Sequence, residues 1–247
     1  MNKYLLLLFI ALQGGLLYGQ QDSVDTKHPL SITLDLMSRY VWRGTDYGGS
    51  PSIQPGISYS LAGFTFGTWG AYTTNNPGVQ EVDLFLSYSI KNMFSLTVTD
   101  YFFPDEGSNY NYFEYGEIRT GHVLEGSLSF DGTDKLPLSI FVATNFYGAD
   151  AQRLNADSTS AGIQYSTYAE AAYTFKYFNV FMGFNLTYPD TERGEIGYYG
   201  TSIGVINLGL TASKKIRITD KFSLPVTASI ITNPQAEKIY LVAGFSF

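Results

Sequence analysis

Apolar and polar residues alternate with a period of two along most of the chain, the pattern of β-strands with one apolar face. In residues 30–43 the even positions are mostly apolar and end in Tyr40 and Trp42, whereas the odd positions are mostly polar and hold three charges. The last ten residues alternate in the same way and place Phe245 and Phe247 on the apolar face. Strands of about ten residues with this alternation are long enough to cross the hydrocarbon of a bilayer with a tilt.

Segments of this kind recur along the whole chain in an even number, as single-chain bacterial outer-membrane barrels require. We therefore predict an all-β fold, a transmembrane antiparallel up-and-down β-barrel of about 12 strands. The predicted strands span residues 30–43, 53–61, 64–73, 80–90, 93–103, 113–130, 138–147, 164–175, 178–188, 199–213, 222–231 and 238–247.

The links between these strands differ in length and composition. Some are tight turns of the hairpin kind, at 62–63, 91–92 and 176–179. Others are longer and rich in Gly, Asn, Asp, Ser and Pro, as surface loops are; they span 44–52, 104–111, 148–162 and 189–197. We expect the tight turns to face the periplasm and the long loops to face the outside. The links 131–137 and 214–221 are also expected on the periplasmic side, although they are not short.

The N-terminus has the features of a secretory signal. Lys3 precedes an apolar run, residues 4–12, and small glycines follow it. Such a run is too short to span a bilayer as a helix, so residues 1–20 are expected to be a cleaved signal peptide. Residues 21–29 would then form a short periplasmic segment and 30–247 the barrel. Export of such a barrel implies a location in the outer membrane of a Gram-negative cell.

Composition favours a membrane barrel over a soluble one. The chain is 16% aromatic and only 15% charged, and aromatic residues form girdles at both interfaces of a membrane barrel. The net charge of -7 argues against binding to nucleic acid. A soluble sandwich or lipocalin-like barrel is the rival interpretation, because it also alternates. Asp100 fits the membrane pattern badly, since it shares the apolar register; either a bulge shifts the register, or Asp100 lies at the interface.

Residues 38–60 carry a resemblance to a known family. The segment Ser-Arg-Tyr-Val-Trp-Arg-Gly at 38–44, a Gly/Ser/Pro loop, and Pro-Ser-Ile-Gln-Pro-Gly-Ile-Ser-Tyr at 51–59 resemble the opening of the TorF-like porin family. The Tyr-Phe-Phe-Pro element at 101–104 and the aromatic C-terminus are similar to that family too. The resemblance implies a barrel and, by family name, a porin. The ending at Phe245 and Phe247 also resembles the assembly signal that the outer-membrane insertion machinery recognises, which would be a partner during assembly.

An enzyme is not expected. The chain holds two histidines, His28 and His122, and no cysteine. Outer-membrane phospholipases place a serine two residues from an outward histidine, whereas Leu124 and Thr120 flank His122 at that spacing. The acidic turns lack the spacing of calcium loops, and no glycine-rich phosphate loop precedes a helix. We therefore expect no catalytic residues, no metal site and no cofactor.

The candidate functional residues are the charged side chains whose register points them into the lumen, because Arg facing lipid at mid-depth costs about 2–4 kcal/mol. They are Asp35, Arg39, Arg43, Glu81, Asp83, Glu117, Arg119, Glu125 and Glu170. They predict a porin-like channel for small solutes or ions with a weak cation preference. In the alternative, these charges pair across a filled barrel that conducts nothing and acts as a structural or adhesive protein through its loops. Lipid and small solutes are the other expected partners.

Overall fold

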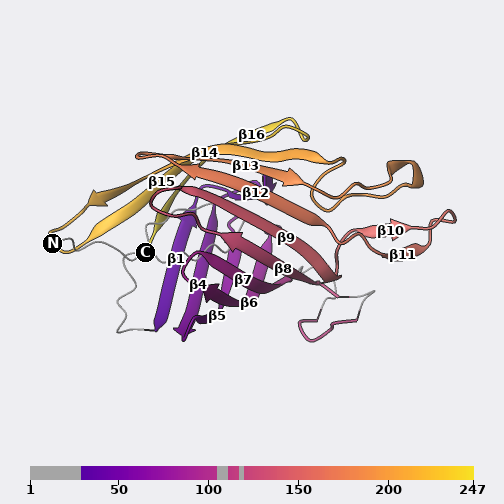
Figure 1. The fold of residues 1–247 in the computed structure, drawn as a ribbon, viewed down its shortest axis with the longest axis horizontal. Helices are drawn as coiled ribbons and strands as arrows, with labels where there is room; N and C mark the ends of the chain where they lie inside the picture. The colour runs from indigo at the N-terminus through magenta and orange to yellow at the C-terminus, as the bar shows by residue number, and fades with distance from the viewer. Residues whose placement is uncertain (1–28, 105–110, 117–119) are drawn as a thin grey trace.

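The computed structural model describes residues 29–104, 111–116 and 120–247 (Figure 1). Twelve antiparallel strands close into one barrel, which confirms the predicted fold class. In barrel order the strands are β1 (Leu30–Met37), β16 (Lys238–Ser246), β15 (Ser223–Asn233), β14 (Gly204–Arg217), β13 (Asn179–Asn185), β12 (Thr167–Thr174), β9 (Leu138–Gly148), β8 (His122–Phe130), β7 (Phe94–Phe102), β6 (Gln80–Ile90), β5 (Phe64–Thr73) and β4 (Ser52–Leu61).

The first and last strands form the seam that closes the barrel. β1 pairs with β4 over its whole length and with β16 through Asp35–Ser246, Leu36–Phe245 and Met37–Gly244. Backbone hydrogen bonds between Leu34 and Phe247 continue this pairing in both directions, at 3.2 and 3.0 Å. Closure leaves every strand with a partner on both sides, which is what a barrel in hydrocarbon needs.

The outer wall is apolar and exposed. Ile32 and Leu241 are 71% and 77% exposed, and the alternate positions of each strand, such as Asp35 and Ser246, point to the inside. This alternation reproduces the predicted apolar face, including Phe245 and Phe247 on the last strand. An exposed apolar wall around a closed barrel is the surface that lipid covers in a transmembrane barrel. Among the described residues no helix is long and apolar enough to cross a membrane.

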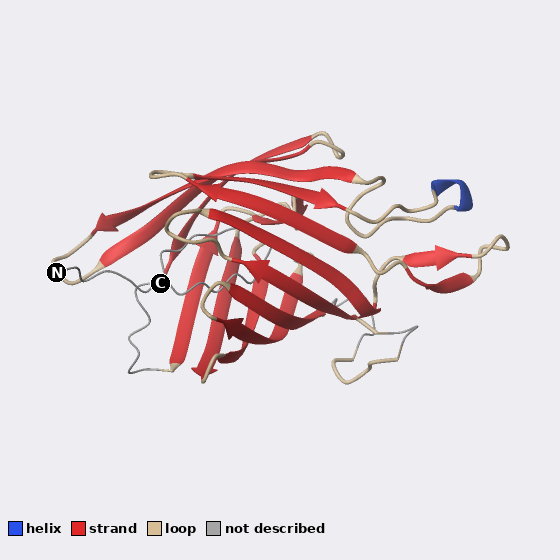
Figure 2. Cartoon of the chain, viewed as in Figure 1, coloured by secondary structure: helices blue, strands red, loops and turns tan. Residues whose placement is uncertain are grey.

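The two ends of the barrel differ (Figure 2). The turn end carries the termini of the barrel and the links 62–63, 91–93, 131–137, 175–178 and 218–222. The loop end carries longer links, including 186–203 with the 3-10 helix η1 (Thr191–Arg193) and 149–166 with the hairpin of β10 (Gln152–Leu154) and β11 (Ser160–Ile163). Both of these links project from the barrel wall at the right of the view. The predicted asymmetry of links is confirmed, with 131–137 and 218–222 at the turn end.

Three predicted strands differ from the observed ones at their ends. One of them is the strand predicted at 199–213, because β14 spans Gly204–Arg217 and includes part of the predicted link 214–221. The first strand ends at Met37 rather than at residue 43, and a separate hairpin of β2 (Tyr40–Trp42) and β3 (Thr45–Tyr47) follows it. The strand predicted from residue 113 begins at His122. The hairpin β10–β11 was not predicted, because short loop hairpins bury no continuous apolar face that a period of two would show. The predicted signal peptide and nearly all of 21–29 lie outside the described residues.

Candidate functional site

A short hairpin fills the middle of the lumen. We call residues 39–47, which contain β2 and β3, the lumen hairpin. Its strands pair through Tyr40–Tyr47 and Trp42–Thr45, so that Arg43 and Gly44 form a two-residue turn. Both turn residues have positive φ, 47° and 78°, as the favoured type of two-residue hairpin turn requires. An arginine rarely adopts this conformation, so its contacts have to offset the strain.

Gly44 allows the tip of the lumen hairpin to touch the barrel wall. A Cβ atom at this position would lie 1.9 Å from the backbone oxygen of Ile206 on β14. The carbonyl oxygen of Gly44 also accepts a hydrogen bond of 3.3 Å from the side chain of Asn233 on β15. The turn therefore needs glycine for two independent reasons, its φ and its close approach to another backbone.

Arg43 is the centre of the polar contacts in the lumen. Its guanidinium donates two hydrogen bonds to Glu125 of β8, at 2.5 and 3.0 Å, and another to the hydroxyl of Tyr199. The side chain is only 1% exposed. The rings of Trp42 and Tyr168 lie against it, with centroids 4.4 and 4.6 Å from Cζ. The two-pronged carboxylate partner and the aromatic faces offset much of the guanidinium's loss of water, although its Nε is buried without a hydrogen-bond partner.

The other lumen carboxylates accept hydrogen bonds from neutral groups. The hydroxyl of Tyr40 in the lumen hairpin donates to Glu81 of β6. Glu170 of β12 accepts hydrogen bonds from Tyr168 and, at 2.8 Å, from Asn207 of β14. Residues from both sides of the barrel therefore meet at the level of Arg43.

Aromatic side chains complete the filling at this level. Tyr40, Trp42, Tyr101, Tyr168 and Tyr199 belong to one buried cluster with Ile206 and Val123. Tyr101 also donates a hydrogen bond of 2.9 Å to Glu125. Aromatic rings with hydroxyl groups can fill space and still satisfy buried carboxylates, which aliphatic residues cannot do.

Between this level and the turn end, the inner face combines hydroxyl groups with buried apolar side chains such as Phe181 and Ala172. Ser58, Thr97, Ser127 and Ser129 are buried on the inner face of β4, β7 and β8. Some hydroxyls pair across strands, as in Thr97–Ser87 at 2.9 Å. Small hydroxyl residues on an inner face are typical of a barrel wall that faces water.

Most predicted lumen residues lie where the register placed them. Asp35, Glu81, Asp83, Glu125 and Glu170 are on the inner face of their strands. Arg43 points into the lumen too, but from the lumen hairpin instead of from a wall strand. Arg39 lies in the link between β1 and β2 and pairs with Asp46 of the lumen hairpin, with its side chain 41% exposed. Glu117 and Arg119 lie outside the described residues.

Tyr40 and Trp42 correct the sequence interpretation. The alternation placed them on the outer apolar face, yet both are buried in the lumen. A signal for this was present, because Arg-Gly between Tyr-Val-Trp and Thr-Asp-Tyr is a two-residue turn flanked by strand-forming residues. Tyr101, Tyr168, Tyr199 and Asn207 also reach the site, and no local pattern distinguishes them from girdle or strand residues.

Asp100 and His122 form a second polar group, on the outer wall near the loop end. The register of β7 is continuous past Asp100, so no bulge turns it inward. His122 Nδ1 lies 2.7 Å from Asp100, and Nε2 lies 2.6 Å from the carbonyl oxygen of Tyr112. Tyr115 stacks on the imidazole at 4.0 Å and hydrogen-bonds Asp100. The segment 111–116, of which 113–116 were predicted to begin a strand, thus covers a polar pair on the outer wall.

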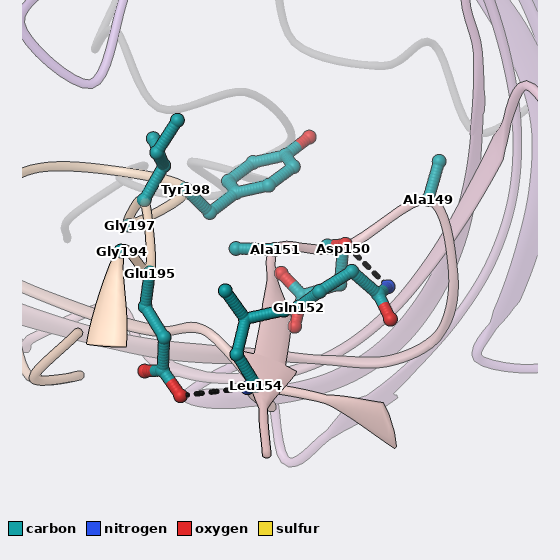
Figure 3. Close-up of a pocket in the computed structure, with 10 residues that line it drawn as sticks. Ala149, Asp150, Ala151, Gln152, Leu154, Gly194, Glu195, Gly197 and Tyr198 are labelled. Atoms are coloured by element: carbon teal, nitrogen blue, oxygen red, sulfur yellow. Dashed lines mark hydrogen bonds between the residues drawn. The ribbon is translucent and has the colours of Figure 1, made fainter. Parts of the chain in front are cut away.

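Glu195 joins two links at the loop end. Its carboxylate accepts hydrogen bonds from the backbone N–H groups of Leu154 and Asp190 and from the guanidinium of Arg153, all between 2.7 and 2.9 Å. A pocket of about 380 Å³ lies between the two links and is lined by Ala149, Asp150, Ala151, Gln152, Leu154, Gly194, Glu195, Ile196, Gly197 and Tyr198 (Figure 3). Its acids are already engaged, and none of the described residues form a group of three or more metal-ligating side chains.

The chain is similar to one family model and to solved structures that include a porin. A family model described as a bacterial protein of unknown function, Gcw_chp, matches residues 21–130, the part that contains the lumen hairpin. No curated protein matches. A triple mutant of the Rh. blastica porin is similar at 13% identity with a TM-score of 0.39, over 79% of this chain and 55% of that porin. The chain thus spans about half the length of that porin. The matching family has no assigned function, so membership of the TorF-like porin family stays a prediction.

Proposed function

We propose that this protein is a narrow outer-membrane channel for small solutes or ions, with a lumen hairpin that constricts its path. The observation that carries the proposal is the charge of the lumen. Five carboxylates, Asp35, Glu81, Asp83, Glu125 and Glu170, and one guanidinium, Arg43, point into the described part of it. A barrel with only a structural role would need no such excess of charge inside.

The polar wall supports a path for water. Hydroxyl residues lie on the inner face of β4, β7 and β8 between the Arg43 level and the turn end, and the outer wall is apolar. A cylinder of this strand number is intermediate between side-chain-filled eight-strand barrels and open porins. The resemblance of residues 38–60 to the TorF-like porin family points to the same function.

The filled level at Arg43 favours a second candidate, a barrel that conducts nothing and acts through its loops. Tyr40, Trp42 and Arg43 occupy the centre of the lumen and are at most 5% exposed. The two candidates differ in what happens when the lumen hairpin is removed. A constricted channel should gain conductance, whereas a filled scaffold should lose its fold or stay silent.

Single-channel recording in planar bilayers separates these outcomes. We expect small discrete steps for the natural protein, and steps several times larger when residues 39–47 are replaced by a glycine–serine linker. The matched control replaces the hairpin β10–β11 at 152–163, which projects outside the lumen, and should leave conductance unchanged. Silence of both the natural protein and the hairpin-replaced variant, with folding intact, would reject the channel.

A weak cation preference is part of the same proposal. A lumen with more carboxylates than guanidinium groups attracts cations, and salt screens this attraction over about 8 Å at physiological ionic strength. Reversal potentials across a potassium chloride gradient should show a preference that fades as the salt concentration rises. Neutralising Glu81 and Asp83 together should reduce it, whereas Asp157→Asn in an exposed loop should not. An anion preference would contradict the proposal.

A further inference from the structure

The hairpin of β14 and β15 projects beyond its neighbours at the turn end. β14 pairs with β15 as far as Arg217–Ser223, while its pairing with β13 stops at Thr211–Asn179. On the other side, the pairing of β15 with β16 stops at Val226–Phe245. Figure 1 shows this hairpin extending past the C-terminus at the left of the view. All residues from 212 to 223 are exposed. We call residues 212–223 the basic hairpin.

One face of the basic hairpin continues the outer wall of β14; Lys214 shares this face, whereas Lys215 and Arg217 lie on the other. Ile216 shares the register of Leu208 and Leu210 on the outer wall of β14, and is 45% exposed. Ile218 and Phe222, at the turn, are 56% and 44% exposed. The apolar outer wall of the barrel therefore continues onto this hairpin, beyond the point where β13 and β16 stop pairing with it. An apolar strip continuous with a lipid-facing wall belongs in the interfacial layer of the membrane.

Positive charge is concentrated on the same hairpin. The eight residues 214–221 contain four cations, Lys214, Lys215, Arg217 and Lys221, and one acid, Asp220, in a chain with a net charge of -7. Arg217 pairs with Asp220, and this pair is highly exposed, at 70% and 91% of the two side chains. Long basic side chains next to an apolar strip can bury their stems and extend their charged ends to the level of lipid headgroups.

We propose that the basic hairpin binds anionic phospholipid, with its lysine and arginine side chains on the headgroup phosphates and its apolar strip against the acyl chains. Each Lys or Arg near an anionic surface contributes about 1 kcal/mol, so four together can select one lipid class from its neighbours. The lipid belongs to the leaflet at the turn end, which in the proposed outer-membrane orientation is the periplasmic leaflet. The inference rests on that orientation and not on conduction.

Fluorescence quenching of a reporter tryptophan tests this proposal in reconstituted vesicles. The reporter is Phe222→Trp on the basic hairpin, and the probes are brominated phosphatidylglycerol and brominated phosphatidylcholine. We expect at least about a fivefold preference for phosphatidylglycerol, the factor that corresponds to about 1 kcal/mol. The control reporter is Phe64→Trp, which is also exposed at the turn end but lies across the barrel beside the uncharged turn 62–63. It should show a ratio near one.

Two further measurements attribute the preference to the basic side chains. The variant K214Q/K215Q/R217Q/K221Q should bring the ratio at the F222W reporter close to one, whereas K91Q/K135Q/K176Q, which changes lysines in other turns, should leave most of it. High salt, at about 1 M, should weaken the preference of the natural sequence because screening then acts within about 3 Å. Should the quadruple variant fail to fold, the salt dependence decides.

Equal quenching by both lipids in the folded, inserted barrel would overturn the proposal and favour an acidic protein as the partner of the basic hairpin. A preference that survives the quadruple substitution would overturn it too. Because quenching requires insertion but no ion flow, its failure is distinguishable from a failure of the channel function.

Discussion

At the scale of single residues, Arg43 is held by more partners than any other charged side chain described above. It is 1% exposed, donates to Glu125 and Tyr199, and lies between two aromatic rings in a backbone conformation that costs energy. Removal of one member of a buried ion pair leaves the other charge without compensation. The strained backbone conformation of Arg43 is therefore kept only while its guanidinium pairs with Glu125.

Arg43→Ala should lower the free energy of unfolding by about 3–5 kcal/mol, the usual cost of leaving a buried partner unpaired. Urea unfolding in lipid vesicles measures this. The variant R43M/E125Q should recover a large part of the loss, because it removes both charges together. Arg193→Ala, at an exposed pair in the link 186–203, serves as the control and should change stability little. A loss for R43A no larger than that of the control would contradict the buried pair.

Two substitutions, Gly44→Ala and Gly194→Ala, separate the effect of the turn's close approach to β14 from the effect of its positive φ. Both effects act at Gly44, where a Cβ would lie 1.9 Å from the oxygen of Ile206. At Gly194, with a similar φ of 80°, a Cβ would meet nothing within 4 Å. We therefore expect Gly44→Ala to displace the lumen hairpin and to increase single-channel conductance. Gly194→Ala should carry only the backbone strain and leave conductance unchanged. Equal behaviour of the two variants would contradict docking of the hairpin against β14.

At the scale of elements, Glu195 fastens the link 149–166 to the link 186–203. The backbone N–H groups of Asp190 and Leu154, and then Arg153, lower the pKa of Glu195 below its ordinary value of 4.5. A carboxylate whose pKa is lower in the folded state contributes stability above its ordinary pKa and loses it as the pH falls through the folded value. The clamp is therefore expected to hold at neutral pH and to open in acid, below pH 4.5.

Limited proteolysis of these two links measures the clamp. Cleavage should be slow at pH 7 and faster at about pH 3, with an acid-active protease such as pepsin used at the low pH and the barrel itself uncut. Glu195→Gln should be cut quickly at pH 7 as well, because a neutral amide accepts weaker hydrogen bonds from Arg153 and the two N–H groups. Glu192→Gln, an exposed acid in the same link, is the matched control. Cleavage of E195Q at the rate of E192Q would show that the clamp contributes nothing.

At the scale of the whole molecule, closure depends on the last strand. β16 pairs with both β15 and β1, and Phe247 continues the pairing through Leu34. Deletion of residues 244–247 removes the rungs opposite Asp35, Leu36 and Met37, so the seam opens and leaves unpaired backbone groups in the membrane. Folded barrels should then be scarce, as judged by the gel shift between unboiled and boiled samples. Normal amounts of the shifted form would show that the seam is dispensable.

The same deletion also tests the predicted assembly signal, because Phe245 and Phe247 lie on the outer face. Phe247→Ala keeps the backbone of the seam and removes only the ring. Loss of assembly in cells with normal refolding from urea would assign the ring to recognition by the insertion machinery. Loss in both would assign it to the stability of the seam.

The sequence by itself determined the barrel. Lipid outside and polar groups inside impose a period of two on every wall strand, so strand number and most strand limits could be predicted, and β5 and β6 agree with the predicted ends. For the same reason the inward positions of Asp35, Glu81, Asp83, Glu125 and Glu170 followed from register alone.

Only the tertiary structure decided where residues 38–48 go. Tyr and Trp are suited both to a membrane interface and to a polar lumen, so alternation cannot distinguish an outer face from a lumen hairpin at Tyr40 and Trp42. The choice rests on contacts between distant parts of the chain, with Glu81 and Glu125 lying 41 and 82 residues beyond their partners Tyr40 and Arg43. Those contacts exist only once the barrel has closed, and no local pattern encodes them.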